Sequence, residues 1–286
     1  MNINYLILAH SNYSHLTRLI HALDDVNVQF YIHIDKKAEF VYETDKSNVY
    51  ILEKRSSIYW GGFGMIEATL ALLKKAKSCG NGGYYILLSG ADFPIRSNET
   101  IRNVLSSKKE FINIQPGPLY HKPIERYQHY YFDIDRRNPK GIRYLLFRFL
   151  EKLQIRLKIK RKIPFNLYVG SQWFALTHEC IEYILDEVNN NVNYLRFFKN
   201  VFIPDEAFFH TIIGNSPFLE RTEGNLTYVD WSVHPGPANI NENHLQKFQE
   251  NEFFETKYGK NKPMFARKFD DNSEDIIKSI TSTIRL

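Results

Sequence analysis

Strand-length apolar runs alternate with helical segments over the first 95 residues, and this alternation strongly limits the folds open to the chain. Apolar runs typical of buried strands cover residues 5–10, 28–35, 49–52 and 84–88. Apolar side chains recur at helical spacing within residues 16–23 and 64–78. The resulting order, β-α-β-β-α-β, predicts an α/β fold with a mostly parallel sheet and helices on both of its faces.

The same pattern resumes in the second half of the chain, with a strand over residues 171–177 and a helix over 178–188. Residues 111–165 are richer in aromatic and basic side chains, which indicates an insertion over the site. From residue 236 on the chain is polar and predicts few strong elements. Since we find no internal repeat and no flexible linker, we predict a single domain over residues 1–286.

Polar side chains lie at the carboxyl ends of the predicted parallel strands. His10 closes the first strand, Asp35 closes the second, and the turn at residues 89–92 follows the fourth. Open α/β sheets bind their ligands beyond this edge. We therefore expect the binding site to include these residues.

The positive charge of the chain is concentrated in one segment. The net charge is +5, yet residues 136–162 hold eleven Lys or Arg and a single acid, Glu151. Leu146, Phe149, Leu150, Leu153 and Leu157 recur within it at helical spacing. Two interpretations stay open, a solvated helix face beside an anionic substrate and a helix docked on an anionic membrane surface. We predict no nucleic-acid partner, because no recognised nucleic-acid module accompanies the segment.

Several classes of protein are excluded by motifs or composition. Aromatic residues make up 15% of the chain, which excludes a disordered protein. The sequence has no GxGxxG after its first strand and no GxxxxGK[ST], GxSxG or HExxH motif. The N-terminus lacks a basic region before its short apolar run, so we expect no cleaved signal and no membrane anchor. Cys79 and Cys180 are expected to be free thiols.

One Asp-x-Asp motif, Asp133-Ile134-Asp135, follows an aromatic run. Two carboxylates so placed can hold Mn²⁺ or Mg²⁺ on a nucleotide-sugar diphosphate. Because Arg136 and Arg137 come next, an ion-paired turn explains the motif equally well.

Two further short motifs also have two interpretations each. Pro204-Asp205-Glu206 has the composition of a helix start, and a carboxylate in its aromatic surroundings can also act as a general base. Arg267 and Lys268 lie between aromatic residues, where adjacent cations are either surface charges or neutralise a diphosphate.

Seven sequence blocks together resemble one known family. In order, they are HIDKKAE, SSIYWGGFGMIEATLALL, YYILLSGADFPIRS, GSQWFALTHECIEYIL, IPDEAFFHTIIGNSPF, LTYVDWS and MFARKF. The chain resembles, from about residue 5 to residue 269, the core-2/I-branching β-1,6-N-acetylglucosaminyltransferases and peptide O-xylosyltransferases of glycosyltransferase family 14. The resemblance implies a Rossmann-like fold of GT-A type, an inverting transfer from a UDP-sugar, and no metal cofactor.

The resemblance also assigns roles by position. It implies that Glu206 is the catalytic base. It implies contacts to the donor nucleotide and its sugar from Leu8, His10, Asp35, Arg55, Tyr59, Asp92, Arg267 and Lys268. The acceptor contacts expected from the less matched part of the chain are Glu125, Arg126 and Trp173.

The chain departs from the animal members of this family. Most of their paired cysteines are missing, as are their stem and anchor, which favours a bacterial-type enzyme. The second cationic position expected after Trp231 has no Arg, so Arg267 is expected to replace it.

We therefore expect a metal-independent inverting transferase that moves GlcNAc or xylose from a UDP-sugar to a hydroxyl of a glycan or lipid-linked glycan. Bacterial surface polysaccharide synthesis is its expected process, in the cytoplasm or on the inner face of the cell membrane. Two alternatives stay open. One is a metal-dependent transferase using Asp133 and Asp135, and the other is a non-catalytic glycan- or membrane-binding protein of the same fold.

Overall fold

A seven-stranded sheet forms the centre of the computed structural model, which describes residues 1–233 and 235–285. Its strand order is β3-β2-β1-β4-β7-β6-β8. The strands are β1 (Ile3–Ala9), β2 (Val28–Ile34), β3 (Val49–Ile51), β4 (Tyr84–Ser89), β6 (Glu110–Pro116), β7 (Tyr168–Thr177) and β8 (Thr222–Glu223). Strands β3, β2, β1 and β4 are parallel, β7 is antiparallel to both of its neighbours, and β8 is parallel to β6. The predicted α/β fold with a mostly parallel sheet is confirmed.

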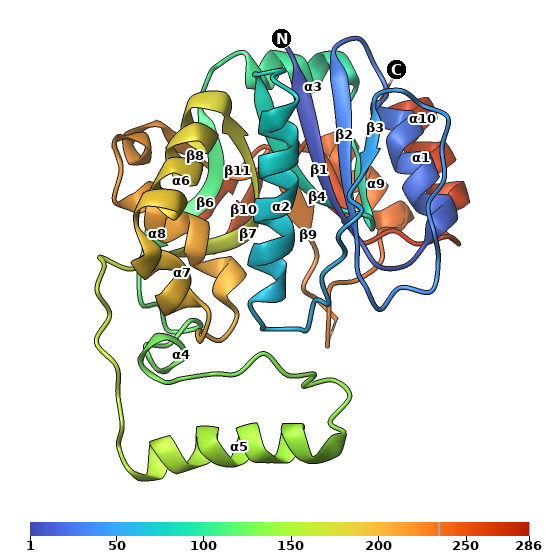
Figure 1. Cartoon of the computed structure of the whole chain (residues 1–286). Helices are drawn as coiled ribbons and strands as arrows, with labels where there is room; N and C mark the ends of the chain where they lie inside the picture. Colours follow the sequence, from blue (N-terminus) through green and yellow to red (C-terminus); the bar gives the residue numbers. More distant parts are fainter. Residues whose placement is uncertain (234, 286) are drawn as a thin grey trace.

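Helices cover both faces of this sheet (Figure 1). One layer contains α2 (Gly64–Ser78), α6 (His178–Asn190), α7 (Val192–Phe198) and α8 (Phe208–Gly214), and the other contains α1 (Tyr13–Leu23) and α3 (Asn98–Leu105). Strand β1 contributes side chains to the hydrophobic cores on both faces of the sheet. Leu6 and Leu8 pack with the first helix layer, and Tyr5 and Ile7 pack with the second. A strand buried on both faces must be apolar throughout, which explains its continuous apolar run.

The elements predicted from the first half of the chain lie close to their expected bounds. Helix α2 spans the predicted residues 64–78, while α1 begins at Tyr13, three residues before the expected start. Cys180 is buried, Cys79 is half-buried, and both are free thiols as expected.

The prediction of few strong elements after residue 236 was wrong. This part contains α9 (Glu242–Glu250), α10 (Glu274–Thr283), the hairpin of β10 (Phe254–Thr256) and β11 (Gly259–Asn261), and strand β12. In a second sheet, β12 (Phe265–Arg267) lies between β5 (Asp92–Pro94) and β9 (Thr227–Val229). Strands of three residues carry no detectable periodicity. Their core forms only when Phe93, Phe248 and Phe269 meet from distant parts of the sequence.

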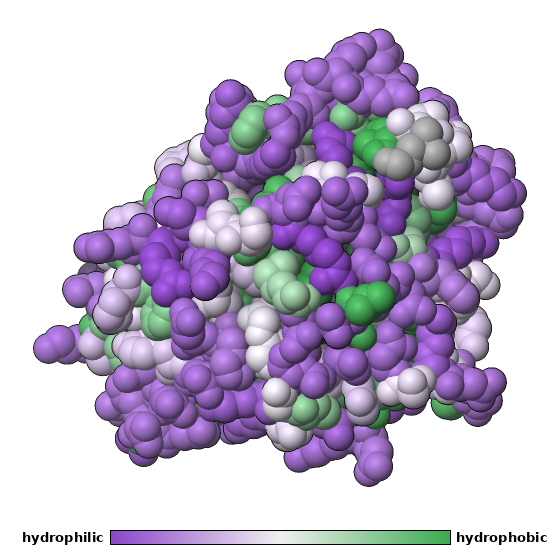
Figure 2. Space-filling view, turned by 90° about the horizontal axis from the view of Figure 1, so that it is seen from above, coloured by the Kyte–Doolittle hydropathy of each residue, from purple (hydrophilic) through white to green (hydrophobic). Residues whose placement is uncertain are grey.

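The predicted insertion at 111–165 is shorter at its start, because residues 111–116 belong to β6 of the central sheet. The rest contains α4 (Glu125–Gln128) and α5 (Gly141–Arg156). Figure 1 shows α5 apart from the other helices, beyond one end of the sheet. The opposite end is mainly hydrophilic, with apolar residues in small separate areas (Figure 2). In the part of the chain that the structure describes, no helix combines the length and the apolar character needed to cross a bilayer.

Candidate active site

The carboxyl ends of β1, β2 and β4 meet at one edge of the sheet, as the sequence predicts. The backbone N–H of Gly90 donates to the carbonyl of Leu8 at 2.9 Å, and that of Asp35 donates to the carbonyl of Ala9 at 2.8 Å. Leu8 is buried, whereas His10 is exposed just beyond the strand. The structure therefore brings Leu8, His10, Asp35 and the turn at 89–92 together.

His10 lies among charged groups from three parts of the chain. Desolvation lowers the pKa of His10, and the positive charges of Lys268 and Arg267 also lower it. The Asp35 carboxylate acts in the opposite direction and raises this pKa. The backbone N–H of Phe269 donates to the Ala91 carbonyl at 2.9 Å, and Arg267 pairs with Asp92, so both cations lie beside the turn that follows β4. Because its pKa lies below the usual value, His10 is neutral near pH 7.

The carboxylate of Asp35 is held by Lys37. Its Oδ1 accepts a hydrogen bond from the Lys37 backbone at 2.9 Å, and its Oδ2 pairs with the Lys37 Nζ at 3.0 Å. The same Nζ lies 4.6 Å from the ring centroid of Tyr59. Lys37 thus joins two predicted nucleotide contacts, although our sequence analysis gave it no role. The sequence signals for Lys37 were its place two residues after Asp35 and its position within the HIDKKAE block.

Arg55 supports the loop that follows β2. Its guanidinium donates to the backbone carbonyls of Ile34 at 3.2 Å, Asp35 at 2.6 Å and Ala38 at 2.8 Å. Arg55, predicted as a nucleotide contact, therefore uses most of its N–H groups to orient the backbone around Asp35.

Arg267 lies between the buried carboxylate of Asp92 and the indole of Trp173, where β12 pairs with β5. Oδ2 of Asp92 accepts from the Ser89 backbone at 2.9 Å, and Oδ1 lies 3.4 Å from Nε of Arg267. The Arg267 guanidinium carbon lies 4.2 Å from the ring centroid of Trp173. Burial raises the pKa of Asp92 to about 6, against the lowering effect of Arg267. Trp173 was predicted as an acceptor contact. In the structure its ring packs against Arg267, the guanidinium that we expect to bind the diphosphate, and helps to fix its position.

Lys268 follows Arg267 at the end of β12 and is half-buried. Its backbone N–H donates to the carbonyl of Ala238 at 3.2 Å. Desolvation lowers the pKa of Lys268, and the neighbouring Arg267 and Arg137 lower it further. An anionic ligand between these cations would relieve their mutual repulsion.

Glu206 ends a short 3-10 helix, η1 (Pro204–Glu206), that leads into α8. Its Oε2 lies 3.0 Å from Nη1 of Arg126 and also pairs with Nζ of Lys122. Burial by itself raises the pKa of Glu206, but these two cations lower it below its usual value. The carboxylate is thus ionised near neutral pH, and 29% of its side chain is exposed to a ligand.

Lys122 is the main residue of this site that our sequence analysis missed. Its side chain is 1% exposed, and its Nζ also donates to the carbonyl of Gly170 at 2.7 Å. Burial lowers the pKa of Lys122 to about 8, although Glu206 raises it. A lone lysine in a loop carries no sequence signal, because only the fold brings it to Glu206.

Two further titratable groups, Asp205 and His210, lie near Glu206. Burial and the nearby Glu206 charge together raise the pKa of Asp205 to about 7. Burial and the Lys122 cation lower the pKa of His210 to about 3, so its ring is neutral. Nε2 of His210 lies 2.9 Å from the Ser171 carbonyl.

Backbone hydrogen bonds connect the segment that holds Glu206 with the segment that holds Tyr59. Ile203 donates to the Gly61 carbonyl at 3.0 Å, next to the predicted donor contact Tyr59. Phe202 donates to the carbonyl of Arg126 at 3.2 Å. Ile203 has a φ of +55°, which is rare for a β-branched residue and is typical of functional segments.

Strand β7 gives a second link between the two sides. Gly170 binds Lys122, and Trp173 lies three residues further along the strand, about 10 Å away. Glu125, the remaining predicted acceptor contact, is exposed in the first turn of α4 beside Arg126.

Comparison with known proteins identifies the family. The sequence model described as Core-2/I-Branching enzyme matches residues 3–255, well over half of the chain. The chain belongs to this family, glycosyltransferase family 14. The resemblance inferred from the seven blocks is therefore confirmed. Arg267 and Lys268 lie beyond the matched residues.

The curated relatives of this branching-enzyme family member include animal xylosyltransferases. Xylosyltransferase 2 of Rattus norvegicus is 26% identical over 291 residues, which cover 94% of this chain and 32% of the relative. Xylosyltransferase 1 of Homo sapiens is 26% identical over 245 residues, covering 81% of this chain and 24% of the relative. The chain thus spans a third or less of the length of these relatives.

In this family member the two carboxylates of the Asp-x-Asp motif have different surroundings. Oδ1 of Asp135 accepts from the backbones of Arg137 at 3.2 Å and Asn138 at 3.1 Å, which forms a turn. Arg136 pairs with Glu151, and within the described residues neither Arg136 nor Arg137 pairs with an acid of the motif. The ion-paired turn, one of the two interpretations of the motif, is therefore wrong. Within residues 1–233 and 235–285, no group of three His, Cys, Asp or Glu side chains is arranged to hold a metal ion.

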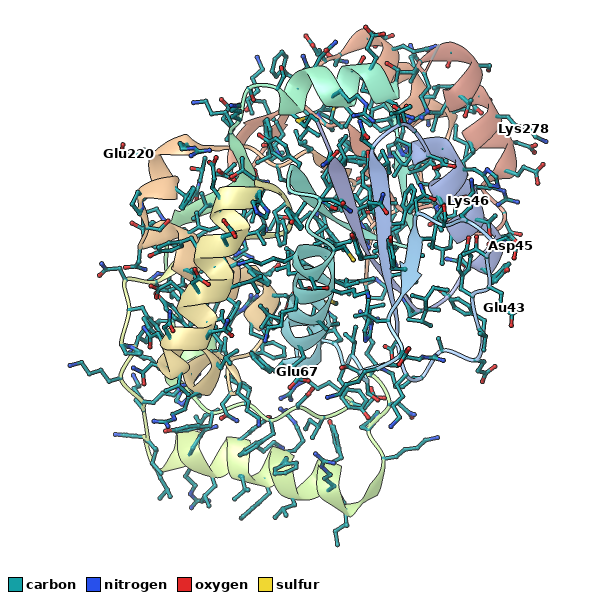
Figure 3. The ribbon with its side chains drawn as sticks, turned by 45° about the horizontal axis from the view of Figure 1, so that its top comes forward. Glu43, Asp45, Lys46, Glu67, Glu220 and Lys278 are labelled. Carbon is teal, nitrogen blue, oxygen red and sulfur yellow. The ribbon has the colours of Figure 1, made fainter. Side chains whose placement is uncertain are left out.

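Asp133 lies in a small cavity of about 170 Å³ with Glu67, Arg143 and Phe147. Burial raises the pKa of Asp133, and the nearby Glu67 raises it further. Figure 3 shows Glu67 at the end of α2 that faces α5.

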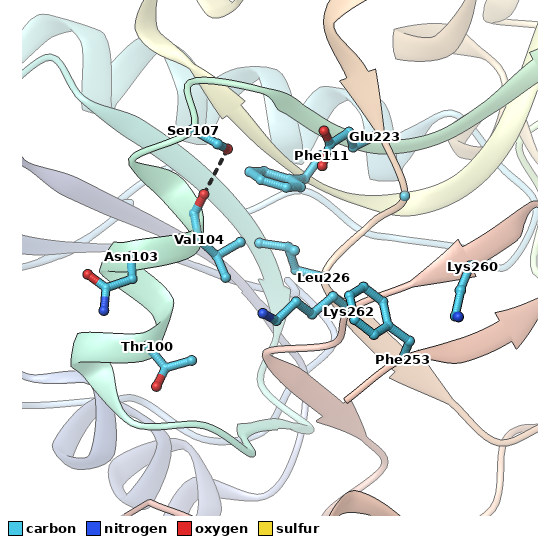
Figure 4. Close-up of a pocket in the computed structure, with 11 residues that line it drawn as sticks. Thr100, Asn103, Val104, Ser107, Phe111, Glu223, Leu226, Phe253, Lys260 and Lys262 are labelled. Atoms are coloured by element: carbon cyan, nitrogen blue, oxygen red, sulfur yellow. Dashed lines mark hydrogen bonds between the residues drawn. The ribbon is translucent and has the colours of Figure 1, made fainter. Parts of the chain in front are cut away.

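A cavity of about 640 Å³ lies near the amino end of β6, where Phe111 lines it, and Glu206 is not among its lining residues. Figure 4 shows the residues that line it. It is bounded by α3, the β10–β11 hairpin and the segment around β8, and none of the predicted site residues lines it. The candidate active site is therefore the open edge at the strand carboxyl ends.

Proposed function

We propose that this family member is a metal-independent, inverting glycosyltransferase that moves a sugar from a UDP-sugar to a glycan hydroxyl. The observation that carries the proposal is the position of Glu206, an ionised, partly exposed carboxylate beside the strand ends. A group of this kind can accept the proton of an incoming hydroxyl.

The donor nucleotide would lie across the carboxyl ends of β1 and β2. Asp35 would accept a hydrogen bond from the uracil N–H or a ribose hydroxyl. Leu8, His10 and Tyr59 would contact the uridine from the same edge, with Arg55 holding the loop. Asp92 would face the donor sugar.

The diphosphate would lie against Arg267 and Lys268. Asp92 and Trp173 hold the Arg267 guanidinium in one orientation, which reduces the reorganisation needed when phosphate binds. A guanidinium and an ammonium next to each other supply both a directed pair of donors and a second positive charge.

The proposed reaction is a single displacement. Glu206 takes the proton of the acceptor hydroxyl, whose oxygen bonds to the anomeric carbon while the bond from that carbon to the UDP oxygen breaks. The electron pair of the broken bond stays on the diphosphate, where Arg267 and Lys268 stabilise it. Attack opposite the leaving group inverts the anomeric configuration, so one carboxylate suffices.

We further propose xylose or GlcNAc as the transferred sugar. The first is supported by the xylosyltransferase relatives, and the second by the resemblance to N-acetylglucosaminyltransferases. Glu125 and Arg126 would contact a glycan or lipid-linked glycan acceptor, in bacterial surface polysaccharide synthesis. The enzyme would then work in the cytoplasm, with residues 136–162 against the inner face of the membrane.

The test is a UDP-sugar binding and transfer screen, run with and without EDTA. We expect one UDP-sugar to be preferred and EDTA to have no effect. Glu206→Gln should reduce transfer by about a hundred- to ten-thousandfold while UDP binding is unchanged. Glu220→Gln is the matched control, because Glu220 is exposed on η2 (Pro217–Arg221), at the outer edge of the molecule (Figure 3).

Three outcomes would overturn parts of the proposal. An unchanged rate in Glu206→Gln would remove the base assignment. Activity that requires Mn²⁺ and is lost in Asp133→Ala would favour the metal-dependent alternative with Asp133 and Asp135. Binding of UDP or a glycan without any turnover would favour the non-catalytic alternative.

A further inference from the structure

Helix α5 presents an apolar stripe to solvent. Ile142, Leu145, Leu146, Phe149 and Leu150 follow the spacing i, i+3, i+4, i+7, i+8, which places them on one helix face. Their exposed fractions range from 36% for Leu150 to 86% for Ile142. In a globular protein such a stripe normally faces the core, so the orientation of α5 needs a physical explanation.

The opposite face of α5 is bonded to the segment that precedes it. The Glu151 carboxylate accepts from the backbone of Phe132 at 3.0 Å, and the Gln154 side chain accepts from the backbone of Tyr130 at 2.7 Å. Phe147 stacks on Phe132, with ring centroids 4.5 Å apart. Because the polar side chains are buried against the protein, the apolar stripe is held outward.

The cations of residues 136–162 divide into an internal and an external set. Arg136 and Arg148 pair with Glu151, and Arg161 donates to three backbone carbonyls. The other eight Lys and Arg side chains are exposed, among them Lys152 and Arg156. In the described part of the chain, none of these eight lies within 4.0 Å of a carboxylate oxygen.

We propose that α5 lies flat on an anionic lipid bilayer, with its apolar stripe among the acyl chains and the external cations among the headgroups. Apolar insertion flanked by Lys and Arg is the pattern of interfacial helices. A second copy of the chain suits the stripe less well, because it would bring two sets of unpaired cations together.

The position of α5 gives the docked enzyme an orientation. It lies beyond the end of the sheet where β1, β2 and β4 have their carboxyl ends, on the same side as the candidate active site (Figure 1). The face at the other end of the sheet is mainly hydrophilic (Figure 2). This inference rests on the proposed function in one respect, that the bilayer would present a lipid-linked acceptor to Glu206. The docking itself needs only α5.

The experiment is flotation of the purified full chain with vesicles. We expect binding to vesicles of phosphatidylcholine mixed with phosphatidylglycerol, and much weaker binding to phosphatidylcholine alone. Leu145→Asp and Phe149→Asp should each lower the partition coefficient at least about tenfold. Lys152→Gln combined with Arg156→Gln should lower it about 25-fold, since each cation near an anionic surface contributes about fivefold.

Matched controls come from other surfaces of the molecule. Val26→Asp introduces the same charge at a side chain that is 73% exposed before β2. Lys74→Gln removes an exposed cation of α2. Both variants should partition within about twofold of the unmodified chain.

The proposal is overturned if the unmodified chain does not float with anionic vesicles, or if the α5 variants float as well as it does. A vesicle-free dimer that Leu145→Asp dissociates would assign the stripe to a second copy and also overturn it. UDP binding of the same variants separates the two proposals. Lost flotation with intact UDP binding concerns docking alone, while lost UDP binding with intact flotation concerns the transferase proposal.

Discussion

The ammonium of Lys122 pairs with the carboxylate of Glu206 from a side chain that is only 1% exposed. The lysine is fixed from its other side by the Gly170 carbonyl, at 2.7 Å. A buried cation held in this way keeps the neighbouring carboxylate both oriented and ionised. Lys122 is therefore a positioning residue for the proposed base.

Replacing this lysine should move the acid limb of the pH–rate profile. In Lys122→Met the main cation that lowers the pKa of Glu206 is lost, so the pKa rises and the base becomes protonated at a higher pH. We expect the limb to move up by about one pH unit or more, with Arg126 still in place. Transfer measured from pH 4 to 8 checks this.

Lys257→Met is the control for this prediction. Lys257 is exposed, so solvent screens the effect of its charge on Glu206. Its loss should leave the acid limb of the profile nearly in place. An equal shift in both variants would contradict a specific role for Lys122.

The buried carboxyl of Asp92 should make stability depend on pH in an unusual direction. Its pKa in the folded chain is about 6, above the unfolded value of about 4, so folding favours the protonated form. The folded state then loses stability as pH rises from about 4 through 6. The two-unit shift corresponds to roughly 3 kcal/mol at neutral pH.

Asp92→Asn removes this titration. The free energy of unfolding of the variant, relative to the unmodified chain, should increase between pH 4.5 and 7.5 in urea unfolding. Asp24→Asn is the control, because a hydrogen bond from Lys46 lowers the pKa of Asp24, so this carboxyl titrates below pH 4.5. The relative stability of Asp24→Asn should stay nearly constant over the same range, and a rise parallel to that of Asp92→Asn would contradict the assignment.

Trp173 should affect donor affinity through Arg267. Trp173→Leu removes the aromatic face 4.2 Å from the guanidinium carbon, and UDP affinity should fall about three- to thirtyfold. Trp173→Phe keeps an aromatic face and should recover most of that loss. Calorimetric titration with UDP measures both, and equal losses in the two variants would contradict the stacking explanation.

Gly170 should tolerate no side chain. A Cβ there would lie 1.6 Å from the Asn113 carbonyl oxygen and 2.5 Å from the His210 ring. Gly170→Ala should therefore lower the free energy of unfolding by roughly 2–4 kcal/mol and disturb the Lys122 contact. Gly236→Ala is the control, since its nearest neighbour is Nζ of Lys268 at 4.0 Å. Similar unfolding curves for the two variants would contradict this packing argument.

Much of the fold could be predicted because its elements carry their own periodicity. The run from Tyr5 to Leu8 must be apolar to lie between two helix layers, and α2 repeats its apolar residues every three or four positions. The C-terminal part was missed for the opposite reason. The three residues of β12 form a strand only because β5 and β9 supply partners from distant positions.

The candidate site divides in the same way. The sequence by itself determined the chemistry at the strand ends, since His10 and Asp35 follow buried strands and Glu206 lies in a recognisable block. Only the tertiary structure decided which groups surround them. Lys122 meets Glu206 across 84 positions, Trp173 turns toward Arg267, and α5 buries Glu151 while exposing Leu145. Such pairings depend on distances between elements, and a linear pattern records only the spacing within one element.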